Sequence, residues 1–173
     1  MNKNYLIRPA EWTDIPRVME IYEIARRFMC ASGNPTQWAG GYPWQDLLED
    51  DIAAGNLYVV CSEETIHGVF AFILGDDPTY ARIENGSWRS TAPYGTIHRI
   101  AGDGSGGIFP AALNHCRSVI DHLRIDTHGN NKPMQHVVAK YGFSRRGIIY
   151  VEDGTPRIAY DRIEREDHDG ISQ

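Results

Sequence analysis

The sequence predicts an α+β domain with a mixed, mostly antiparallel central sheet flanked by helices. Two pairs of apolar runs, within residues 57–74 and 143–163, are each joined by a short polar turn, which is typical of antiparallel hairpins. Between them, residues 95–127 show the order strand, helix, strand, which is typical of one parallel crossover. Hairpins that are segregated from a single crossover favour an α+β domain over a fully parallel sheet.

A short apolar strand over residues 5–9 precedes the first helix. Thr13 is the candidate N-cap, because its hydroxyl can accept from a free N–H of the first turn. Apolar side chains then recur at helical spacing and predict a helix that runs to about Cys30. The members of this apolar face are Ile15, Val18, Met19, Tyr22, Ala25 and Met29.

Residues 31–43 are rich in glycine and proline and predict a loop. The loop carries Trp38 and Tyr42, and Trp44 follows directly. Aromatic side chains at this density either line a pocket or cover the core from outside, and both alternatives stay open. A short amphipathic helix over residues 47–53 comes next.

The middle of the chain predicts three strands and one irregular segment. Residues 57–61 and 66–74 are apolar and are separated by a polar turn, so they predict a hairpin. Residues 79–88 alternate only weakly, which predicts an irregular strand or an insertion. Residues 95–101 form the next expected strand.

The segment after this strand predicts a helix, a strand and a second helix. Residues 123–127 are the expected strand, and Asn131 is the expected N-cap of the second helix, with Pro133 in its first turn. The apolar face of the first of these helices consists of Ile108, Ala112, Cys116 and Val119.

Two strands, residues 143–151 and 156–163, complete the expected fold. No linker, internal repeat or low-complexity tract divides the chain. We therefore expect one domain over residues 1–163, followed by a polar tail over residues 164–173.

Composition excludes several classes of partner. The chain of 173 residues has a formal net charge of −6 and no long basic run, so we expect no nucleic-acid partner and no membrane partner. An amine substrate suits the acidic balance. No signal-peptide pattern and no apolar run of roughly 18 residues occurs, which predicts a cytoplasmic protein. Cys30, Cys61 and Cys116 lack metal-ligand spacing, and we expect no metal.

A glycine loop between a strand and a helix is the most informative motif. Gly102, Gly104 and Gly107 spell G-x-G-x-x-G, and the free N–H groups of the helix start favour a bound phosphate. With Asp126 at the end of the next strand, the motif also matches the fingerprint of an NAD-binding oxidoreductase. The hairpins that precede the loop argue against that alternative, because a dinucleotide-binding fold needs several parallel units.

Three stretches carry a resemblance to a known family. Residues 97–101 (IHRIA), residues 105–108 (SGGI) and residues 131–143 (NKPMQHVVAKYGF) resemble the central strand, the phosphate loop and the last helix of the GNAT superfamily of N-acetyltransferases. The resemblance covers about residues 5–163 and implies a GNAT-like acyl-CoA N-acyltransferase fold. The third stretch is the most specific, because it combines an N-cap, an apolar face and a helix-ending Gly-Phe at fixed distances.

The resemblance implies an N-acetyltransferase that moves an acetyl group from acetyl-CoA, with CoA as product, to a primary amine of a small molecule or peptide. The amine would attack directly in a ternary complex, and a homodimer would be common for the family. The identity of the acceptor stays open. The implied cofactor-binding residues are Ile100 and Ala101 on the central strand, Ser105, Gly106, Gly107, Ile108 and Phe109 in the phosphate loop, and Asn131.

The chain departs from the family pattern at two places. The loop lacks the Arg or Gln that usually opens its signature, and Val138 stands where many members have the Tyr that protonates the leaving thiolate. A non-catalytic acyl-CoA-binding protein on the same fold is therefore a further alternative. For the acid and base, the candidates are His98, Glu84 and Tyr141.

Overall fold

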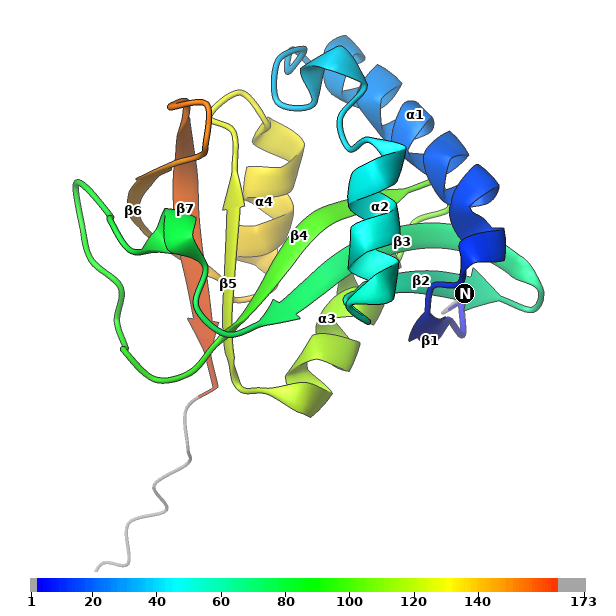
Figure 1. Ribbon diagram of the computed structural model, residues 1–173. Helices are drawn as coiled ribbons and strands as arrows, with labels where there is room; N and C mark the ends of the chain where they lie inside the picture. Colours follow the sequence, from blue (N-terminus) through cyan, green and yellow to red (C-terminus); the bar gives the residue numbers. More distant parts are fainter. Residues whose placement is uncertain (1–2, 165–173) are drawn as a thin grey trace, which may run out of the picture.

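The computed structural model describes residues 3–164, which form one mixed sheet with helices on both faces (Figure 1). The sheet has seven strands in the order β1-β2-β3-β4-β5-β7-β6. Neighbouring strands are antiparallel except β4 and β5, which confirms the expected mixed, mostly antiparallel sheet. The strands are β1 (Leu6–Pro9), β2 (Leu57–Ser62), β3 (Thr65–Leu74), β4 (Gly95–Gly102), β5 (His122–Thr127), β6 (Ser144–Tyr150) and β7 (Pro156–Ile163).

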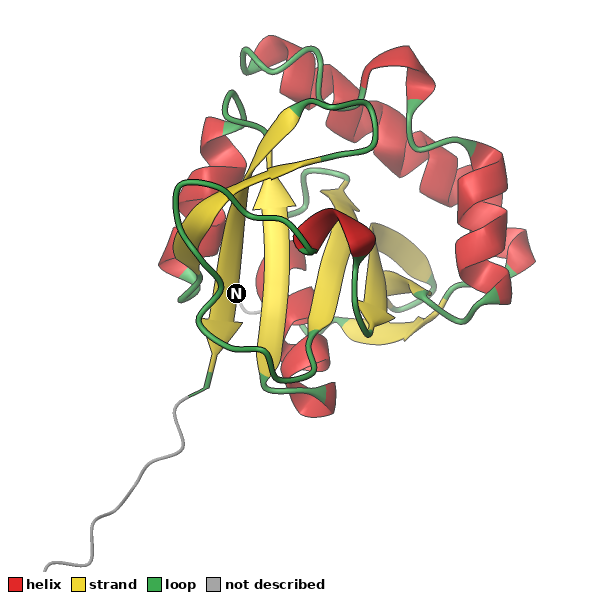
Figure 2. Cartoon of the chain, turned by 60° about the vertical axis from the view of Figure 1, so that its left-hand side comes forward, coloured by secondary structure: helices red, strands yellow, loops and turns green. Residues whose placement is uncertain are grey.

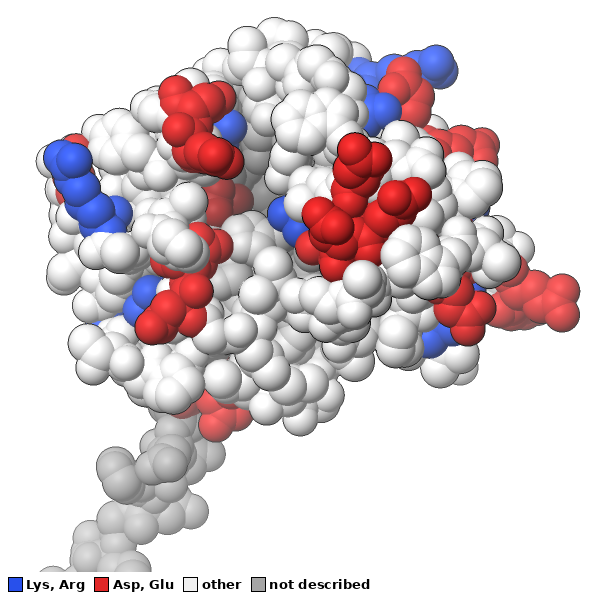
Figure 3. Space-filling model, in the orientation of Figure 1, with Lys and Arg blue, Asp and Glu red and all other residues white. Residues whose placement is uncertain are grey.

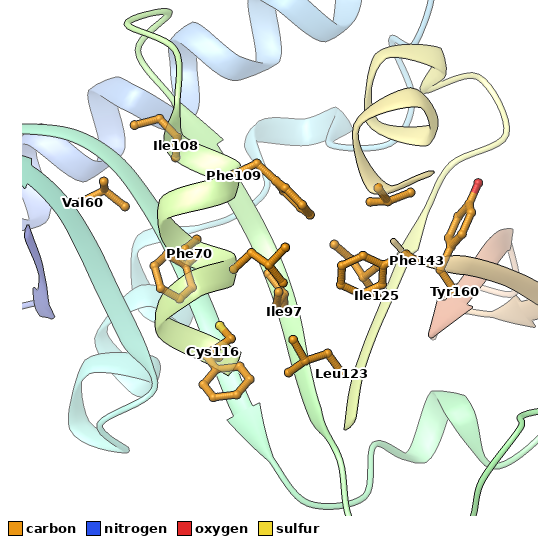
Figure 4. Close-up of a cluster of buried hydrophobic side chains, with 14 of the residues drawn as sticks. Val60, Phe70, Ile97, Ile108, Phe109, Cys116, Leu123, Ile125, Phe143 and Tyr160 are labelled. Carbon is orange, nitrogen blue, oxygen red and sulfur yellow. The ribbon is translucent and has the colours of Figure 1, made fainter. Parts of the chain in front are cut away.

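Four α-helices cover the two faces of the sheet (Figure 2). They are α1 (Ile15–Ala31), α2 (Gln45–Ala53), α3 (Ile108–Val119) and α4 (Lys132–Lys140). Alternate residues of β3 divide between the two layers, because successive strand side chains point to opposite faces. Phe70 and Phe72 pack with α3 and α4 in one buried cluster (Figure 4), whereas Val69 and Ala71 pack with α1 and α2 in another.

The helix ends differ from expectation at three points. Thr13 is not the N-cap of α1, since it lies inside a 3₁₀ turn (Trp12–Asp14) and the helix begins at Ile15. Helix α2 starts two residues earlier than predicted. Val119, the last residue of α3, is 50% exposed and so does not belong to the buried face of this helix. The predicted cap of α4 is confirmed, since the Asn131 side chain accepts from the Met134 N–H at 3.2 Å.

The loop between β3 and β4 covers the end of the sheet that α1 and α2 leave open (Figure 2). It contains a 3₁₀ turn (Pro78–Tyr80) and one isolated bridge to β6, so the expected irregular segment is an insertion. The guanidinium carbon of Arg124 on β5 lies between two aromatic rings, 3.9 Å from the Trp88 centroid and 3.8 Å from the Tyr94 centroid. This cation–π sandwich attaches the loop to the sheet.

Strands β4 and β5 diverge along their length, which Figure 1 shows as a widening gap. They pair only at Gly95↔Leu123 and Thr96↔Arg124. Within β4, the register against β3 shifts at a bulge, where Arg99 has a φ of 51°. A bulge adds an unpaired residue and bends the strand. One parallel pair, already splayed, is incompatible with the doubly wound sheet of the dinucleotide-binding alternative, which is therefore wrong.

Within residues 3–164, no helix combines the length and apolar character that crossing a bilayer requires.

Candidate functional site

A cavity of about 680 Å³ lies where β4 and β5 separate. Its walls come from both strands, from the loop between α1 and α2, and from the β6–β7 turn. Figure 3 shows a hollow between α2 and the β6–β7 end, with acidic side chains on both sides. Trp38, Tyr42 and Trp44 line the cavity, which confirms the pocket-lining alternative. Trp38 also packs on Tyr22 in the core, with ring centroids 5.6 Å apart, so this one side chain does both.

His98 and Asp77 form a hydrogen-bonded pair in the cavity wall. The imidazole Nε2 lies 2.9 Å from Asp77 Oδ2, and both side chains are mostly buried. Burial raises the pKa of Asp77, but hydrogen bonds from His98 and Thr79 outweigh it and lower the pKa to about 2. An ionised carboxylate can only accept, so Nε2 carries the proton and Nδ1 is left as the basic nitrogen. The pair therefore has the arrangement of an oriented general base.

The bulge in β4 is held by buried polar contacts from α1 and α2. Arg99 Nη2 donates to Asp51 Oδ2 at 2.6 Å, and the Tyr22 hydroxyl donates to the Arg99 carbonyl at 2.8 Å. Burial lowers the pKa of Arg99, but electrostatic interactions with Tyr42, Asp51 and Tyr22 raise it above its ordinary value, so the guanidinium stays charged. A left-handed conformation is costly for a non-glycine residue, and these contacts explain how Arg99 retains it.

Ile100 and Ala101 follow the bulge, where β4 has lost its partner on the β5 side. Backbone groups on this edge face a cavity instead of a ladder, and Ile100 lines it. They are free to bind an extended, amide-containing chain in the way that a further strand would. This geometry fits the expected role of Ile100 and Ala101 toward a pantetheine arm.

Asp126, the expected ribose-binding acid of the dinucleotide alternative, lines the cavity and accepts a hydrogen bond from a buried tyrosine. The Tyr80 hydroxyl donates to Asp126 Oδ2 at 2.6 Å, and Tyr80 is only 2% exposed. Burial, together with the charge and hydrogen bond of Asp126, raises the pKa of Tyr80 well above its ordinary value. Tyr80 therefore stays neutral and holds the carboxylate of Asp126 against the cavity wall.

The glycine loop presents free backbone donors at the start of α3. Gly104, Gly106 and Gly107 all have positive φ, and nothing lies within 4 Å of a Cβ added at Gly104 or Gly106. In the described chain, the N–H groups of Gly106, Gly107, Ile108 and Phe109 have no acceptor within the protein. They are the unsatisfied donors of a helix N-terminus, which favour an anion. A second cavity, of about 780 Å³, adjoins the loop.

Asp103 introduces a negative charge into this loop that neighbouring residues compensate. Its Oδ2 lies 3.0 Å from Arg17 and 2.9 Å from His67, and its Oδ1 accepts from the Ser105 N–H. Burial raises the pKa of Asp103, but hydrogen bonds from Ser105 and His67 lower it below its ordinary value. Ser105 therefore uses its N–H inside the loop, which removes it from the expected donors unless the loop rearranges.

Ser105, His67 and Asp103 have the composition of a nucleophilic triad but not its geometry. Ser105 Oγ and Asp103 Oδ2 both contact the same nitrogen of His67, Nδ1, at 3.1 and 2.9 Å. A triad needs the acid and the nucleophile on opposite ring nitrogens. The cluster braces the loop.

Asn131 connects α4 to the loop above the cavity. Its Nδ2 donates to Gln37 Oε1 at 3.0 Å, and Gln37 also accepts from Asn34 Nδ2 at 2.8 Å. Asn131 and Gln37 both line the cavity. The loop between α1 and α2 is thus joined to α4 across the gap that β4 and β5 leave.

The other expected residues lie away from the cavity. Glu84 pairs with Arg82 and accepts from the Tyr150 hydroxyl at 2.9 Å. Tyr141 follows α4 and packs on Phe109, with ring centroids 5.6 Å apart. The structure thus places His98 at the cavity and does not bring Glu84 or Tyr141 there. Among the described residues, no group of three or more His, Cys, Asp and Glu side chains lies close enough together to hold a metal ion.

Sequence reasoning missed the acid that pairs with His98 and the acid that pairs with its neighbour Arg99. Asp77 lies in the loop after β3 and Asp51 lies on α2, both far from β4 in the sequence. The spacing Asp-Pro-Thr at residues 77–79 did contain a signal, because a side-chain cap of this kind holds an acid in place. Nothing in the sequence indicated that Gln37 meets Asn131.

The comparisons with known proteins agree with this geometry. No family model matches the chain, and no curated protein sequence does. A solved acetyltransferase of the GNAT family from Streptococcus agalactiae 2603 is 30% identical, with 94% of this chain and 96% of that chain covered and a TM-score of 0.84. A GNAT-family acetyltransferase from Listeria monocytogenes 4b F2365 is 17% identical, with 92% and 95% covered and a TM-score of 0.69.

A further solved structure contains a ligand. N-acetylglutamate synthase from Neisseria gonorrhoeae, complexed with coenzyme A and N-acetyl-glutamate, is 14% identical and has a TM-score of 0.58. The match covers 95% of this chain and 36% of that chain, and at this identity it shows the fold alone. The similarity to the S. agalactiae protein extends over nearly the whole of both chains, and the chain therefore belongs to the GNAT family of acetyltransferases.

Proposed function

We propose that this protein is an acetyl-CoA-dependent N-acetyltransferase that acetylates a primary amine by direct attack in a ternary complex. The observation that carries the proposal is the opening between β4 and β5, which joins unpaired backbone on β4 to a cavity that contains the His98–Asp77 pair. The coenzyme A complex of the synthase with the same fold supports a coenzyme A thioester as donor.

The residues present fit such a donor. The free N–H groups of Gly106, Gly107, Ile108 and Phe109 would hold the pyrophosphate at the positive end of α3, with open space beside Gly104 and Gly106. Ile100 and Ala101 would pair with the pantetheine arm along the free edge of β4. Asn131 would bind the same arm once its Nδ2 group is released from the hydrogen bond to Gln37 Oε1. When bound, acetyl-CoA supplies a thioester whose carbonyl carbon the amine attacks.

His98 would take the proton that the amine must lose. An ammonium has no lone pair, so only the neutral amine is a nucleophile. Asp77 holds the imidazole with Nδ1 unprotonated, and the ionised carboxylate stabilises the imidazolium that forms. A pair oriented in this way can accept a proton from the attacking amine. The arrangement also positions the two reactants, which can lower a barrier by roughly 7–11 kcal/mol in well-aligned cases.

The leaving thiolate of CoA must be protonated. In this protein the proton would come from water or from a residue other than the Tyr that most family members use. Val138 is fully buried in the core at the position of the usual Tyr. No hydroxyl from this position of α4 reaches the cavity. This substitution favours the second candidate function, an acyl-CoA-binding protein without turnover, and the test below distinguishes the two.

The first experiment compares the thermal unfolding midpoint with acetyl-CoA, free CoA and NAD. A ligand at 100 times its Kd adds about 2.7 kcal/mol of stability, which raises the midpoint of a domain this size by roughly 5–10 °C. We expect a rise with both CoA species and none with NAD. Release of free CoA with an amine panel then separates an enzyme from a binding protein. No shift with either CoA species would refute the proposal.

A further inference from the structure

Arg157 is a buried arginine that faces the cavity without a charged partner. It is 8% exposed and lines the cavity from β7. Its Nη1 donates to Thr155 Oγ1 and to the Pro156 carbonyl, both at 2.9 Å, and it forms no ion pair with any residue between positions 3 and 164. Arginine is rarely buried unless it is paired, because an uncompensated charge is costly away from water.

The remaining donors of Arg157 are open to the cavity. Within the described chain, Nε and Nη2 have no acceptor, yet neither is among the polar atoms that are sealed from solvent. Asp153 is not that acceptor, since its carboxylate accepts from the N–H and the hydroxyl of Thr155 and has no direct contact with Arg157. The guanidinium therefore keeps a free edge, and that edge matches the two oxygens of a carboxylate.

The sheet register places Arg157 beside the reacting end of the cavity. Asp126 on β5 lies opposite Ala159 on β7, and opposite residues of antiparallel strands share a face. Arg157 is two residues from Ala159, so it lies on that face as the diagonal neighbour of Asp126, roughly 7–8 Å away. His98 is two residues past the Thr96↔Arg124 pair and therefore lies on the same face.

Three neighbouring strands thus present a base, an acid and a cation in one row. His98 on β4, Asp126 on β5 and Arg157 on β7 all line the cavity. Ala159, which lies opposite Asp126, is fully buried against Tyr80 and does not line the cavity, so the small side chain contributes the floor beneath this row. An amine near His98 and Asp126 would have its other substituents directed toward Arg157.

From this row we propose that the acceptor is an amino acid or a close relative, whose carboxylate binds Arg157 while its amine lies beside His98 and Asp126. The inference rests on the proposed function and names its substrate class. A singly charged carboxylate suits the site better than a phosphate, because Asp126 and Asp153 lie near and repel a dianion. The aromatic side chains of Trp38, Tyr42 and Trp44 form the wall available to an apolar side chain.

The test uses matched acceptors that differ only in the carboxylate. Acetyl-CoA is combined with L-amino acids, with their C-terminal amides and with the corresponding decarboxylated amines, for example phenylalanine, phenylalaninamide and 2-phenylethylamine. CoA release gives kcat/KM for each. We expect the free acids to be preferred by roughly 10–100-fold, the range for a hydrogen bond between charged groups. Amides or amines that react as well as the acids would overturn the proposal.

Variants assign the preference to one side chain. Arg157→Gln should remove the preference for the free acid and leave the Kd of acetyl-CoA unchanged. Arg157→Lys should retain part of the preference, because lysine keeps the positive charge but cannot donate two parallel hydrogen bonds to a carboxylate. Arg145→Gln is the matched control, since Arg145 lies on the same hairpin, is exposed and does not line the cavity. A preference that survives Arg157→Gln would contradict the proposal.

A second readout does not require the acceptor to be in the panel. We expect sodium propionate to raise the unfolding midpoint of the wild-type protein above that in sodium chloride of equal ionic strength, and to lose this effect in Arg157→Gln. The variant itself should unfold at or above the wild-type midpoint, because it removes an unpaired buried charge. A midpoint lowered by several degrees would make Arg157 a structural residue of the β6–β7 turn and end the proposal. Failure of acetyl-CoA to bind would instead refute the proposed function, and the propionate result would still decide the role of Arg157.

Discussion

The Nε2 atom of His98 lies 2.9 Å from the carboxylate of Asp77, although the two residues belong to different elements and are 21 positions apart. Asp77 is fixed from the other side by Thr79, whose N–H and hydroxyl both donate to its Oδ1, and its own N–H donates to the Tyr94 hydroxyl at 2.7 Å. The acid is therefore positioned before any ligand arrives, and the imidazole is oriented by it.

Asp77→Asn should lower kcat roughly 10- to 100-fold and leave the Kd of acetyl-CoA within twofold. The amide keeps the hydrogen bonds to Thr79 but no longer stabilises an imidazolium. The acid limb of the pH–rate profile should consequently move to lower pH. Steady-state kinetics between pH 5 and 9 test this, and an unchanged profile would show that Asp77 does not act through His98.

Asp77 should also stabilise the folded protein in a way that acid removes. Its folded-state pKa is about 2, below the ordinary 3.8, so the stabilisation is present above about pH 4 and is lost progressively as the pH falls through 2. The linkage amounts to about 2 kcal/mol. The difference in unfolding free energy between wild type and Asp77→Asn, measured by urea denaturation, should be largest at pH 6 and should shrink progressively as the pH falls from about 4 toward 2. A constant difference would contradict the depressed pKa.

His98→Ala should lower turnover at neutral pH far more than Glu84→Gln or Tyr141→Phe. His98 lies in the cavity wall, whereas Glu84 is engaged by Arg82 and Tyr150, and Tyr141 packs on Phe109. All three variants should bind acetyl-CoA with nearly wild-type affinity, which calorimetry checks. A larger loss in Glu84→Gln would transfer the role of base to Glu84.

Gly106→Pro should weaken binding of acetyl-CoA at least roughly tenfold, the value of one hydrogen bond to a charged group. Proline removes a free N–H of the loop and requires a φ near −65°, whereas Gly106 has 79°. Gly55→Pro is the control, because Gly55 has a φ of 74° in the turn after α2, away from both cavities. The control should lose stability and keep its affinity. Equal affinity in both would remove Gly106 from the site.

Asp51→Asn should destabilise the fold by about 3 kcal/mol, because it leaves the Arg99 guanidinium buried beside a neutral amide. Urea denaturation measures the loss. The double variant Asp51→Leu with Arg99→Met should be more stable than Asp51→Asn, since replacing a buried ion pair by apolar side chains costs less than breaking it. If Asp51→Asn leaves the free energy of unfolding unchanged, the Asp51–Arg99 pair does not hold the bulge in β4.

Local signals accounted for most of the elements. The capping side chain of Asn131, the apolar spacing of α1 and the hairpin of β2 and β3 are encoded within a few residues of each other, so they could be predicted in order and nearly to the residue. The prediction for Thr13 failed for the same reason, because a residue suited to capping lies directly before the actual N-cap, Asp14.

The site was only partly accessible from the sequence. His98 lies on β4 and the glycine loop follows this strand directly, so their positions relative to the sheet could be inferred. Asp77, Asp126 and Arg157 could not be related to them, because each belongs to a different element and only the strand register sets their distances. Asp126 illustrates the difference, since the sequence suggested a ribose-binding acid and the structure shows a hydrogen bond from Tyr80.

The sequence by itself determined the element order, the glycine loop at a helix start and the family resemblance, because these depend on short-range spacing along the chain. Only the tertiary structure decided that β4 and β5 separate after Thr96 and that His98, Asp126 and Arg157 share one face of the cavity. The physical reason is that strand register and bulges arise from contacts between segments distant in sequence, and a shift of one residue would turn each of these side chains to the opposite face.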